Sequence, residues 1–487
     1  MALRIAFIGA GSCGFTRRLV GDILTVPEFA DTTFAFMDIN ERNLDAVTQL
    51  VERDIDANKL PARIVTTTDR RAALEAADYV INTTRIGGMD AFEMDVEIPL
   101  KYGIDQCVGD TLCAGGIMYG QRNIPAILDF CKDIGDVAKP GALFLNYANP
   151  MAMNTWVALK YGQVNTVGLC HGVQHSHQQI ATVIEVAVNG DKAADDPDYV
   201  SVSTDDVSIA AAGINHQTWF IKAHYNGEDW LPRLLDGFEK HPKFRCTEKV
   251  RIDMLRRFGH YSTESNGHLS EYVPWYRKRP DEIAEWIDMS SWMNGETAGY
   301  LRVCNDRRDW YKTYLPMWMK EEPRRYAPDN RSLEHGSYII EAIETGRVYR
   351  GHFNVRNNNC ISNLPADAIV EVPGFVDSNG INTPAVGDLP LGCAAVCDVS
   401  INVQRLAVEA AIHGDVELLK QAMMLDPLVG AVCNPPEISQ LVDEMLIAQA
   451  GWLPQYTEAI PAASARLNSE QPLGIRDGRA AASQMQT

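Results

Sequence analysis

The first forty residues alternate between apolar runs and short glycine-rich or polar breaks. RIAFI (4–8) is followed by GAGSCG (9–14), and LVGDILTV (19–26) then carries apolar residues at helical spacing. A second apolar run, TFAFM (33–37), leads into Asp38. Short continuous apolar runs are typical of strands buried on both faces of a parallel sheet. The pattern therefore predicts a strand–turn–helix–strand unit at the start of the chain.

The same rhythm continues to about residue 170. ADYVINTTRIGG (77–88), PGALFLNYANPMA (140–152) and VNTVGLC (164–170) each predict a strand that ends in polar or small residues. Strands that alternate with helical segments predict an α/β fold, with a Rossmann-like doubly wound parallel sheet over residues 1–200. Ligands bind such sheets at the carboxyl ends of the strands. The side chains at those ends are Asn82, Asn149, Cys170 and His171.

The pattern changes beyond residue 200. Residues 207–228 alternate as strands do, 229–330 are rich in aromatic and charged residues with helical stretches, and 399–450 are largely helical. We expect an α+β catalytic, substrate-binding and oligomerisation domain over residues 201–455. Residues 456–487 form a C-terminal extension, rich in Ala, Ser and Gln from about residue 460, that we expect to be loosely held.

Composition narrows the possible partners. The 487 residues carry a formal net charge of -20, which argues against nucleic acid and anionic membranes because both need clustered Lys and Arg. No apolar run approaches the length of a membrane span, and the N-terminus lacks the pattern of a signal peptide. The 11 cysteines are scattered without a CxxC pair, which favours reduced thiols and a cytoplasmic protein.

The glycine-rich turn has the spacing of a dinucleotide site. Gly9 permits the tight turn, Gly11 lets the backbone approach a pyrophosphate, and Gly14 allows close packing of helix on strand. Asp38 can accept hydrogen bonds from the adenosine ribose and would repel a 2'-phosphate, so NAD is favoured over NADP. The predicted cofactor contacts are Gly9, Gly11, Ser12, Gly14, Asp38 and Asn82.

Polar clusters suggest further chemistry without deciding it. GLCHGVQHSH (168–177) places a soft Cys ligand beside several imidazoles, which could bind a transition metal or form the solvated first turn of a helix. His216 lies within an apolar strand pattern, where a histidine of the core is the more common case. YSTESNGHLSEYVPWY (261–276) has the density of a pocket wall. GIDQCVGDTLCAGG (103–116) combines acids with glycine, as a turn or a closing loop would.

Taken together, these motifs resemble glycoside hydrolase family 4, the NAD- and metal-dependent glycosidases, to about residue 455. Some of them, namely NPMAMNTW, TES…EYVPW and MLRRFG, resemble the melibiase-type α-galactosidases of that family most. The motifs that carry the resemblance are IGAGS (8–12), MDIN (37–40), DTLCAGGIMYGQRNIP (110–125), NYANPMAMNTW (146–156), GLCHGVQ (168–174), GINHQTWF (213–220), TESNGHLSEYVPW (263–275) and NLPADAIVEVPGFVDSNGI (363–381).

The resemblance implies a lactate/malate dehydrogenase-like fold and a redox route to hydrolysis. In that route the sugar is oxidised at C3, deprotonated at C2, loses its aglycone by elimination and takes up water, and the hydride then returns. NAD and a divalent metal, usually Mn²⁺, are the implied cofactors. The implied partners are a small neutral glycoside and a homodimer or homotetramer of the chain.

The resemblance also assigns roles to individual positions. Cys170 and His216 match the metal ligands that also meet the substrate, and Asn149 matches a substrate-binding residue. His171 is the expected acid for the leaving oxygen, and Asp110 matches an acid that tunes the base. His268 is our first choice for the C2 base, while Glu264 and Tyr272 are close enough to compete.

Two features leave the substrate open. The melibiase relatives read CHSVQGT where this chain reads CHGVQHSH, and Gly172 resembles the α-glucosidase branch instead. A His after Cys170 favours unphosphorylated sugars. We therefore expect an α-galactosidase, with an α-glucosidase or α-galacturonidase as alternatives. No Arg stands out in the sequence as the partner of a C6 carboxylate.

Readings outside this family are weaker. A 2-hydroxy-acid dehydrogenase would share the βα framework but needs an Arg pair and a His–Asp couple, and it needs no metal thiolate. A non-enzymatic NAD-responsive binding protein would not need the dense polar segment 263–275. Sensitivity to a chelator separates the dehydrogenase from a metal-dependent glycosidase.

Overall fold

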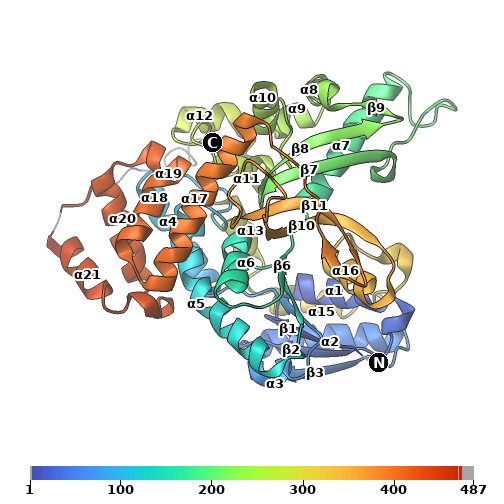
Figure 1. The fold of residues 1–487 in the computed structure, drawn as a ribbon, viewed down its shortest axis with the longest axis horizontal. Coiled ribbons are helices and arrows are strands. Elements are labelled where there is room, and N and C mark those ends of the chain that lie inside the picture. Colours follow the sequence, from blue (N-terminus) through green and yellow to red (C-terminus); the bar gives the residue numbers. More distant parts are fainter. Residues whose placement is uncertain (1–2, 470, 474–487) are drawn as a thin grey trace.

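The computed structural model describes residues 3–469 and 471–473 and contains one large mixed sheet (Figure 1). Its strands are β1 (Arg4–Ile8), β2 (Thr33–Met37), β3 (Arg63–Thr67), β4 (Tyr79–Asn82), β5 (Leu143–Asn146), β6 (Thr166–Gly168), β7 (Val207–Ile214), β8 (Gln217–Tyr225), β9 (Glu228–Asp229), β10 (Tyr349–Arg356), β11 (Ile369–Asp377) and β12 (Gly380–Asn382).

Six of these strands form a parallel sheet in the order β3-β2-β1-β4-β5-β6. This is the strand order of dinucleotide-binding folds, in which the chain reverses direction next to the first strand. The connecting helices are α1 (Cys13–Leu24), α2 (Glu41–Ala57), α3 (Arg70–Leu74), α4 (Gly88–Lys101), α5 (Cys113–Val137), α6 (Met151–Lys160) and α7 (Gly172–Asn189). The expected Rossmann-like α/β fold is confirmed.

The sheet continues past the last parallel strand without interruption. β10 pairs antiparallel with β6, and β11, β7, β8 and β9 follow in that order, with β12 on the side of β11. Asn354 of β10 lies opposite Gly168 of β6, so a late segment of the chain joins the early one. The expected division at residues 200 and 455 stays a prediction.

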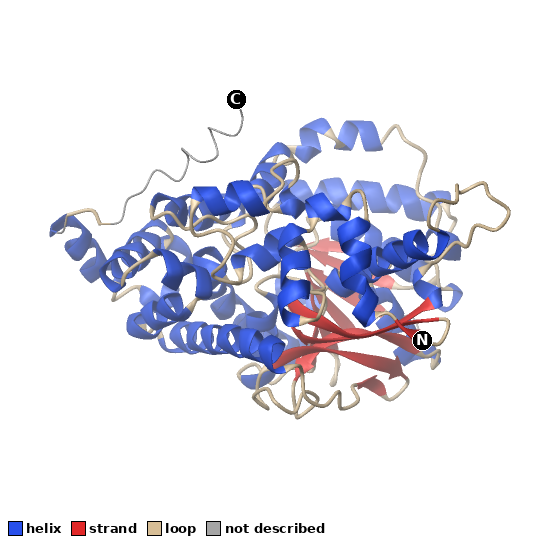
Figure 2. Ribbon diagram, turned by 90° about the horizontal axis from the view of Figure 1, so that it is seen from above, coloured by secondary structure: helices blue, strands red, loops and turns tan. Residues whose placement is uncertain are grey.

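The remaining helices surround this sheet (Figure 2). They are α8 (Leu231–Lys240), α9 (Phe244–Thr247), α10 (Lys249–Phe258), α11 (Asn266–Glu271), α12 (Pro280–Trp286), α13 (Gly299–Asp306), α14 (Trp310–Thr313), α15 (Leu315–Trp318), α16 (His335–Thr345), α17 (Leu391–His413), α18 (Val416–Leu425), α19 (Pro427–Val432), α20 (Pro435–Ala448) and α21 (Ile460–Ser469). In Figure 1, α18 to α21 lie at one end of the molecule and the β7–β9 strands at the other.

The apolar run of β1 is explained by two cores, one on each face of the sheet. Ile5 and Phe7 belong to the core that includes residues of α1, α2 and α16, whereas Ala6 and Ile8 belong to the core that includes residues of α5, α17 and α20. All four side chains are fully buried or nearly so. Because neighbouring side chains of a strand point to opposite faces, a strand covered on both sides must be apolar throughout.

One helix differs from the expectation that no apolar segment approaches the length of a membrane span. α17 is long and apolar enough to cross a membrane by length and composition alone, which the sequence reading of short apolar runs missed. Half of its most apolar window is buried inside the protein. Residues such as Cys393, Ile401 and Val408 lie in the cores, as expected for a central helix of a globular fold.

The C-terminal extension begins with ordered structure. Residues 460–469, expected to be loosely held, form α21, and Arg466 makes a two-pronged ion pair with Asp443 of α20. That part of the expectation is wrong because the apolar side of the segment has a helix to pack against. The last residues of the extension, 474–487, lie outside the described residues.

Candidate active site

The glycine-rich turn after β1 is shaped by its neighbours in the protein. Gly9 has a φ of +87°, and an added Cβ would meet the backbone N of Thr84 at 2.9 Å. An added Cβ at Gly11 would meet the Asp38 carboxylate at 2.7 Å, and the Gly11 amide donates to Asp38 Oδ2 at 2.8 Å. Glycine is therefore required at both positions for the turn and for the acid to lie against it.

The N-terminus of α1 follows directly from this turn. Ser12 is the N-cap residue, its side chain caps no amide, and no acidic residue occupies the first turn. Gly14 is exposed, and a Cβ added there would meet no atom within 4 Å. The expected role of Gly14 in close helix–strand packing is therefore wrong, whereas an uncapped helix N-terminus of this kind suits an anion such as a pyrophosphate.

Asp38 and Asn82, both expected to contact the cofactor, differ in exposure. Asp38 is half-buried at the end of β2, and its second oxygen accepts from the Asn40 amide at 2.8 Å. Asn82 has no exposed surface: it donates to Asn146 at 2.9 Å and accepts from Thr84. A direct cofactor contact by Asn82 is therefore not supported. Its side-chain amide joins the carboxyl ends of β4 and β5, the rim of the sheet where ligands of such folds bind.

Cys170 follows β6 on the same rim and lies beside two donors from distant parts of the chain. One ligand atom each of Cys170, His216 and Glu264 lies within 4.8 Å of the others. Cys170 Sγ is 3.8 Å from Glu264 Oε2, and the Gly172 amide lies 3.5 Å from the sulfur. Burial raises the pKa of the Cys170 thiol well above its usual value, so a metal that binds there must displace a proton.

His216 is presented by the tight turn between β7 and β8. Ile214 pairs with Gln217, so the turn consists of Asn215 and His216, and His216 has a φ of +63°. Left-handed backbone at a non-glycine residue is uncommon and often marks a functional position. His216 Nδ1 contacts Thr111 Oγ1 at 3.0 Å, which leaves Nε2 directed at Glu264 Oε2, 3.5 Å away. Burial lowers the pKa of His216 to about 4, so the ring is neutral and able to bind a metal.

Glu264 reaches the site because its segment extends the antiparallel sheet. Ser262 bridges to Trp219 of β8, and the Thr263 amide donates to Thr218. Burial raises the pKa of Glu264, but the imidazoles of His216 and His268 and the Ser265 amide outweigh it and lower that pKa to about 2. The carboxylate is ionised.

A second group of donors shares His216. Asp110, His216 and His268 each place one ligand atom within 4.8 Å of the others, and all three residues are buried. Asn149 donates from Nδ2 to Asp110 Oδ2 at 2.9 Å. His268 Nδ1 contacts Ser265 Oγ at 2.7 Å, and its ring centroid is 4.6 Å from that of His216. The structure thus brings together six of the residues singled out from the sequence.

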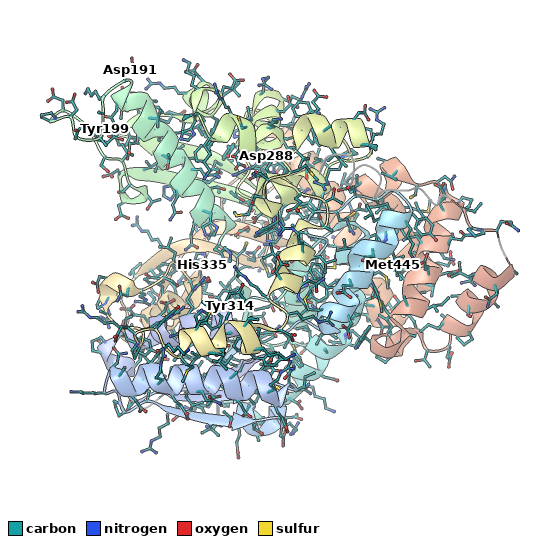
Figure 3. The ribbon with its side chains drawn as sticks, turned by 180° about the vertical axis from the view of Figure 1, so that it is seen from behind. Asp191, Tyr199, Asp288, Tyr314, His335 and Met445 are labelled. Carbon is teal, nitrogen blue, oxygen red and sulfur yellow. The ribbon has the colours of Figure 1, made fainter. Side chains whose placement is uncertain are left out.

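His171 follows Cys170 directly and is the N-cap residue of α7. Its side chain is 41% exposed, and its Nδ1 is 3.9 Å from Glu334 Oε2. Both of those atoms are buried and make no hydrogen bond. Glu334 immediately precedes α16, whose first residue, His335, lies in the interior of the molecule in Figure 3, whereas Asp191 and Tyr199 lie at its edge.

The other imidazoles near Cys170 do not join the donor groups. His177 contacts the Val207 carbonyl at 2.8 Å, and His175 is exposed with its ring edge-on to His171. Tyr272, a competitor for the base, is fully buried, and burial raises the pKa of its hydroxyl well above the usual value. A phenol that is so hard to ionise is poorly suited to remove a proton.

Several residues of the site were missed by sequence reasoning. Arg85, after β4, makes no hydrogen bond or ion pair within the described residues, and its guanidinium lies 4.4 Å from the ring centroid of Phe92. Thr111 orients His216, and Glu334 faces His171. Glu371 of β11 is buried outside both donor groups, and this burial raises its pKa to about 8. Thr111 neighbours Asp110, Glu371 lies within the motif 363–381 and Arg85 within the segment 77–88, but the sequence assigned no role to any of them.

Comparisons with known proteins identify the class. Residues 4–186 match the model of the family 4 glycosyl hydrolases, and residues 211–429 match the model of the family 4 glycosyl hydrolase C-terminal domain. The chain belongs to the family 4 glycosyl hydrolases. The resemblance deduced from the motifs is confirmed, and the readings outside the family have no comparable support.

Individual relatives extend over nearly the whole chain. An alpha-galactosidase of Rhizobium meliloti is 58% identical over 467 residues, which is 96% of this chain and 92% of that protein. An alpha-galactosidase of Bacillus subtilis is 33% identical over 93% of this chain and 99% of its own length. A solved 6-phospho-alpha-glucosidase from gut microorganisms, in complex with NAD and Mn²⁺, is 19% identical with a TM-score of 0.75 over 93% of this chain and 99% of its own, a likeness of fold.

Proposed function

We propose that this chain is an NAD- and Mn²⁺-dependent α-galactosidase that acts on unphosphorylated α-galactosides. The observation that carries the proposal is the convergence of the buried donors Cys170, His216 and Glu264 with Asp110 and His268, on the rim that also carries the glycine-rich turn. The alpha-galactosidases among its relatives support the choice of sugar.

The described residues suit both cofactors. The uncapped N-terminus of α1, beside the Gly11 amide and Asp38, can receive the pyrophosphate and ribose of NAD. Cys170 and the neutral His216 are donors that Mn²⁺, Fe²⁺, Co²⁺ or Ni²⁺ would accept. When bound, NAD would take up and return a hydride at the sugar C3, and the metal would stabilise negative charge on the sugar oxygens.

The chain's own side chains account for binding and proton transfer. Asn149 presents its amide to sugar hydroxyls, and Asp110, joined to it by a hydrogen bond, is the acid that tunes the base. His268, held by Ser265, removes the proton from C2. His171, whose side chain is partly exposed and faces Glu334, donates a proton to the departing oxygen.

An α-galacturonidase is a second candidate because of Arg85. Its guanidinium is partly buried beside aromatic rings, forms no ion pair within the described residues although Asp110 is the nearest carboxylate to act on its charge, and follows the end of β4. A planar guanidinium binds a carboxylate through two hydrogen bonds, and a C6 carboxylate is what distinguishes a galacturonide from a galactoside. The α-glucosidase alternative rests on Gly172 alone.

The proposal also includes a cellular location and an oligomeric state. All 11 cysteines are free thiols within the described residues, as suits a reducing cytoplasm. We propose a cytoplasmic enzyme that acts on a small neutral glycoside as a homodimer or homotetramer, without nucleic acid or membrane partners.

The proposal is tested by hydrolysis of p-nitrophenyl α-galactoside, α-glucoside and α-galacturonide side by side. Each assay contains NAD, Mn²⁺ and a thiol reductant, and is repeated with NAD or Mn²⁺ omitted. We expect galactoside cleavage to exceed the other two and to collapse when either cofactor is left out. Cleavage that persists without both cofactors would contradict the mechanism, and a preference for galacturonide would reassign the substrate to the Arg85 reading.

A further inference from the structure

We propose that Glu264 is a third protein ligand of the divalent metal and that Gly172 is the residue that lets it reach the ion. The inference rests on the metal dependence proposed above and deepens it. It replaces the alternative role of Glu264 as the C2 base, which the sequence had left open.

The spacing between Glu264 Oε2 and His216 Nε2 fits a shared cation better than a hydrogen bond, and the Cys170 thiol, which donates a weak hydrogen bond to the same oxygen, would lose its proton to the metal. Glu264 Oε2 is 3.5 Å from His216 Nε2 and 3.8 Å from Cys170 Sγ. A hydrogen bond between imidazole and carboxylate is shorter, roughly 2.7–3.2 Å. Ligands bound to one transition metal at about 2.0–2.3 Å each lie about 3–4 Å apart.

The other polar atoms of these side chains are already engaged. His216 Nδ1 is held by Thr111, and Glu264 Oε1 accepts from the Ser265 amide at 3.1 Å and faces His268 Nδ1 at 3.6 Å. Each side chain is therefore fixed by one atom, and the two remaining atoms, His216 Nε2 and Glu264 Oε2, face each other beside Cys170. Ligands fixed by outer hydrogen bonds are characteristic of metal sites.

Gly172 occupies the position that decides whether Glu264 fits. An added Cβ at Gly172 would lie 2.4 Å from Glu264 Oε2 and 3.2 Å from its Cδ. The carboxylate is the end of a flexible side chain, so it would move away while the helix stays in place. The Gly172 amide lies 3.5 Å from Cys170 Sγ, so this one residue contacts the thiol and makes room for the carboxylate.

A third ligand with a hard oxygen has a chemical consequence. Thiolate and imidazole alone suit Zn²⁺ and other borderline metals, whereas carboxylate oxygen suits Mn²⁺ and Mg²⁺. Glu264 would therefore shift the preference of the site toward Mn²⁺. Its negative charge and that of a Cys170 thiolate would together balance the ion.

The test measures Mn²⁺ binding directly, without sugar or turnover. The full-length protein is titrated with MnCl₂, and free Mn²⁺ is followed by its electron paramagnetic resonance signal. The variants are Glu264→Gln, Gly172→Ala and the double variant. Glu371→Gln is the matched control because it replaces a buried, uncharged carboxyl nearby, and Gly135→Ala is the glycine control because its Cβ would meet nothing within 4 Å.

We expect Glu264→Gln to weaken Mn²⁺ binding at least as much as loss of an outer-shell partner does, about 10- to 100-fold, with less effect on Zn²⁺. Gly172→Ala should weaken it similarly and should add nothing in the Glu264→Gln background, because both act through one carboxylate. The two controls should bind Mn²⁺ as the wild type does.

Other results would overturn the inference. Unchanged Mn²⁺ binding in Glu264→Gln, in a protein with wild-type circular dichroism, would remove the ligand role while leaving the proposed glycosidase intact. A loss in Gly172→Ala that persists in the double variant would show that Gly172 acts independently of Glu264. Failure of the wild type itself to bind Mn²⁺ would count against the proposed function.

Discussion

The nucleotide rim, which is the glycine-rich turn after β1 together with Asp38, and the metal site are built in different ways. The rim residues Gly9, Gly11 and Asp38 come from one short continuous segment, and local backbone geometry explains each of them. The metal site joins Cys170 after β6, His216 in the β7–β8 turn and Glu264 beyond β8. A sheet that changes from parallel to antiparallel brings those segments together.

The comparison teaches that each part should fail separately. No described hydrogen bond joins the Gly11–Asp38 pair to Cys170, His216 or Glu264. A change in one part should therefore weaken one cofactor and spare the other, whereas turnover needs both.

The largest loss of turnover should follow His268→Ala. We expect kcat to fall about 100- to 10,000-fold, because a general base contributes on that scale, while NAD and Mn²⁺ still bind. The measurement is steady-state hydrolysis of p-nitrophenyl α-galactoside, together with calorimetric titration of each cofactor. His175→Ala, an exposed imidazole outside both donor groups, is the control and should keep its activity. An active His268→Ala protein would transfer the role of base to another residue.

His171→Ala should give a smaller loss that depends on the substrate. We expect about a 100-fold lower kcat for a galactoside with a sugar leaving group, and less than about tenfold for the nitrophenyl galactoside, whose leaving group needs no proton. The two substrates are compared with the same preparation of enzyme. Equal losses on both would remove His171 as the acid.

Gly11→Ala should weaken NAD binding and leave Mn²⁺ binding unchanged. The added Cβ would meet Asp38 Oδ2 at 2.7 Å, so we expect NAD to bind about tenfold more weakly and Mn²⁺ to bind unchanged. Gly14→Ala is the matched comparison because its Cβ meets no protein atom within 4 Å. A larger loss of NAD binding in Gly14→Ala would mean that contact with the ligand, and not with Asp38, is the reason for glycine in this turn.

The smallest effect concerns stability at Glu371. Burial raises its pKa from 4.5 unfolded to about 8 folded, so the folded protein holds an extra proton between those values. Stability from this group is therefore complete below pH 4.5 and is lost as the pH rises through 8. Between pH 5 and pH 8, the wild type should lose roughly 1–3 kcal/mol more unfolding free energy than Glu371→Gln. Urea unfolding at both pH values measures this, and parallel losses would contradict it.

The two parts also differ in how far the sequence could predict them. The order of β1 to β6 and the Gly9–Gly11–Asp38 unit follow from apolar runs and glycine spacing, which are local signals. Burial of Asn82 and the open space around Gly14 depend on side chains packed from elsewhere, so the packing role of Gly14 was misjudged and the cofactor contact of Asn82 stays a prediction.

At the metal site, the sequence predicted two of the proposed metal ligands, but it did not predict the contact between Gly172 and Glu264. The motifs supplied Cys170 and His216, yet nothing local shows that Gly172 leaves room for Glu264, because that contact spans two segments far apart in the chain. Glu334 and Arg85 were missed for the same reason: the significance of Glu334 lies in a buried oxygen without a hydrogen-bond partner, and that of Arg85 in its place beside aromatic rings, and only the fold shows either. Spatial proximity, unlike periodicity, leaves little trace in a single sequence.

The most direct test of the separation is titration of one Cys170→Ser preparation with Mn²⁺ and then with NAD. The account predicts that Mn²⁺ binding falls about 100-fold or more, because a soft ligand is lost, while the Kd for NAD stays within about twofold of the wild-type value. Loss of NAD binding in parallel with Mn²⁺, or Mn²⁺ binding as tight as in the wild type, would contradict it.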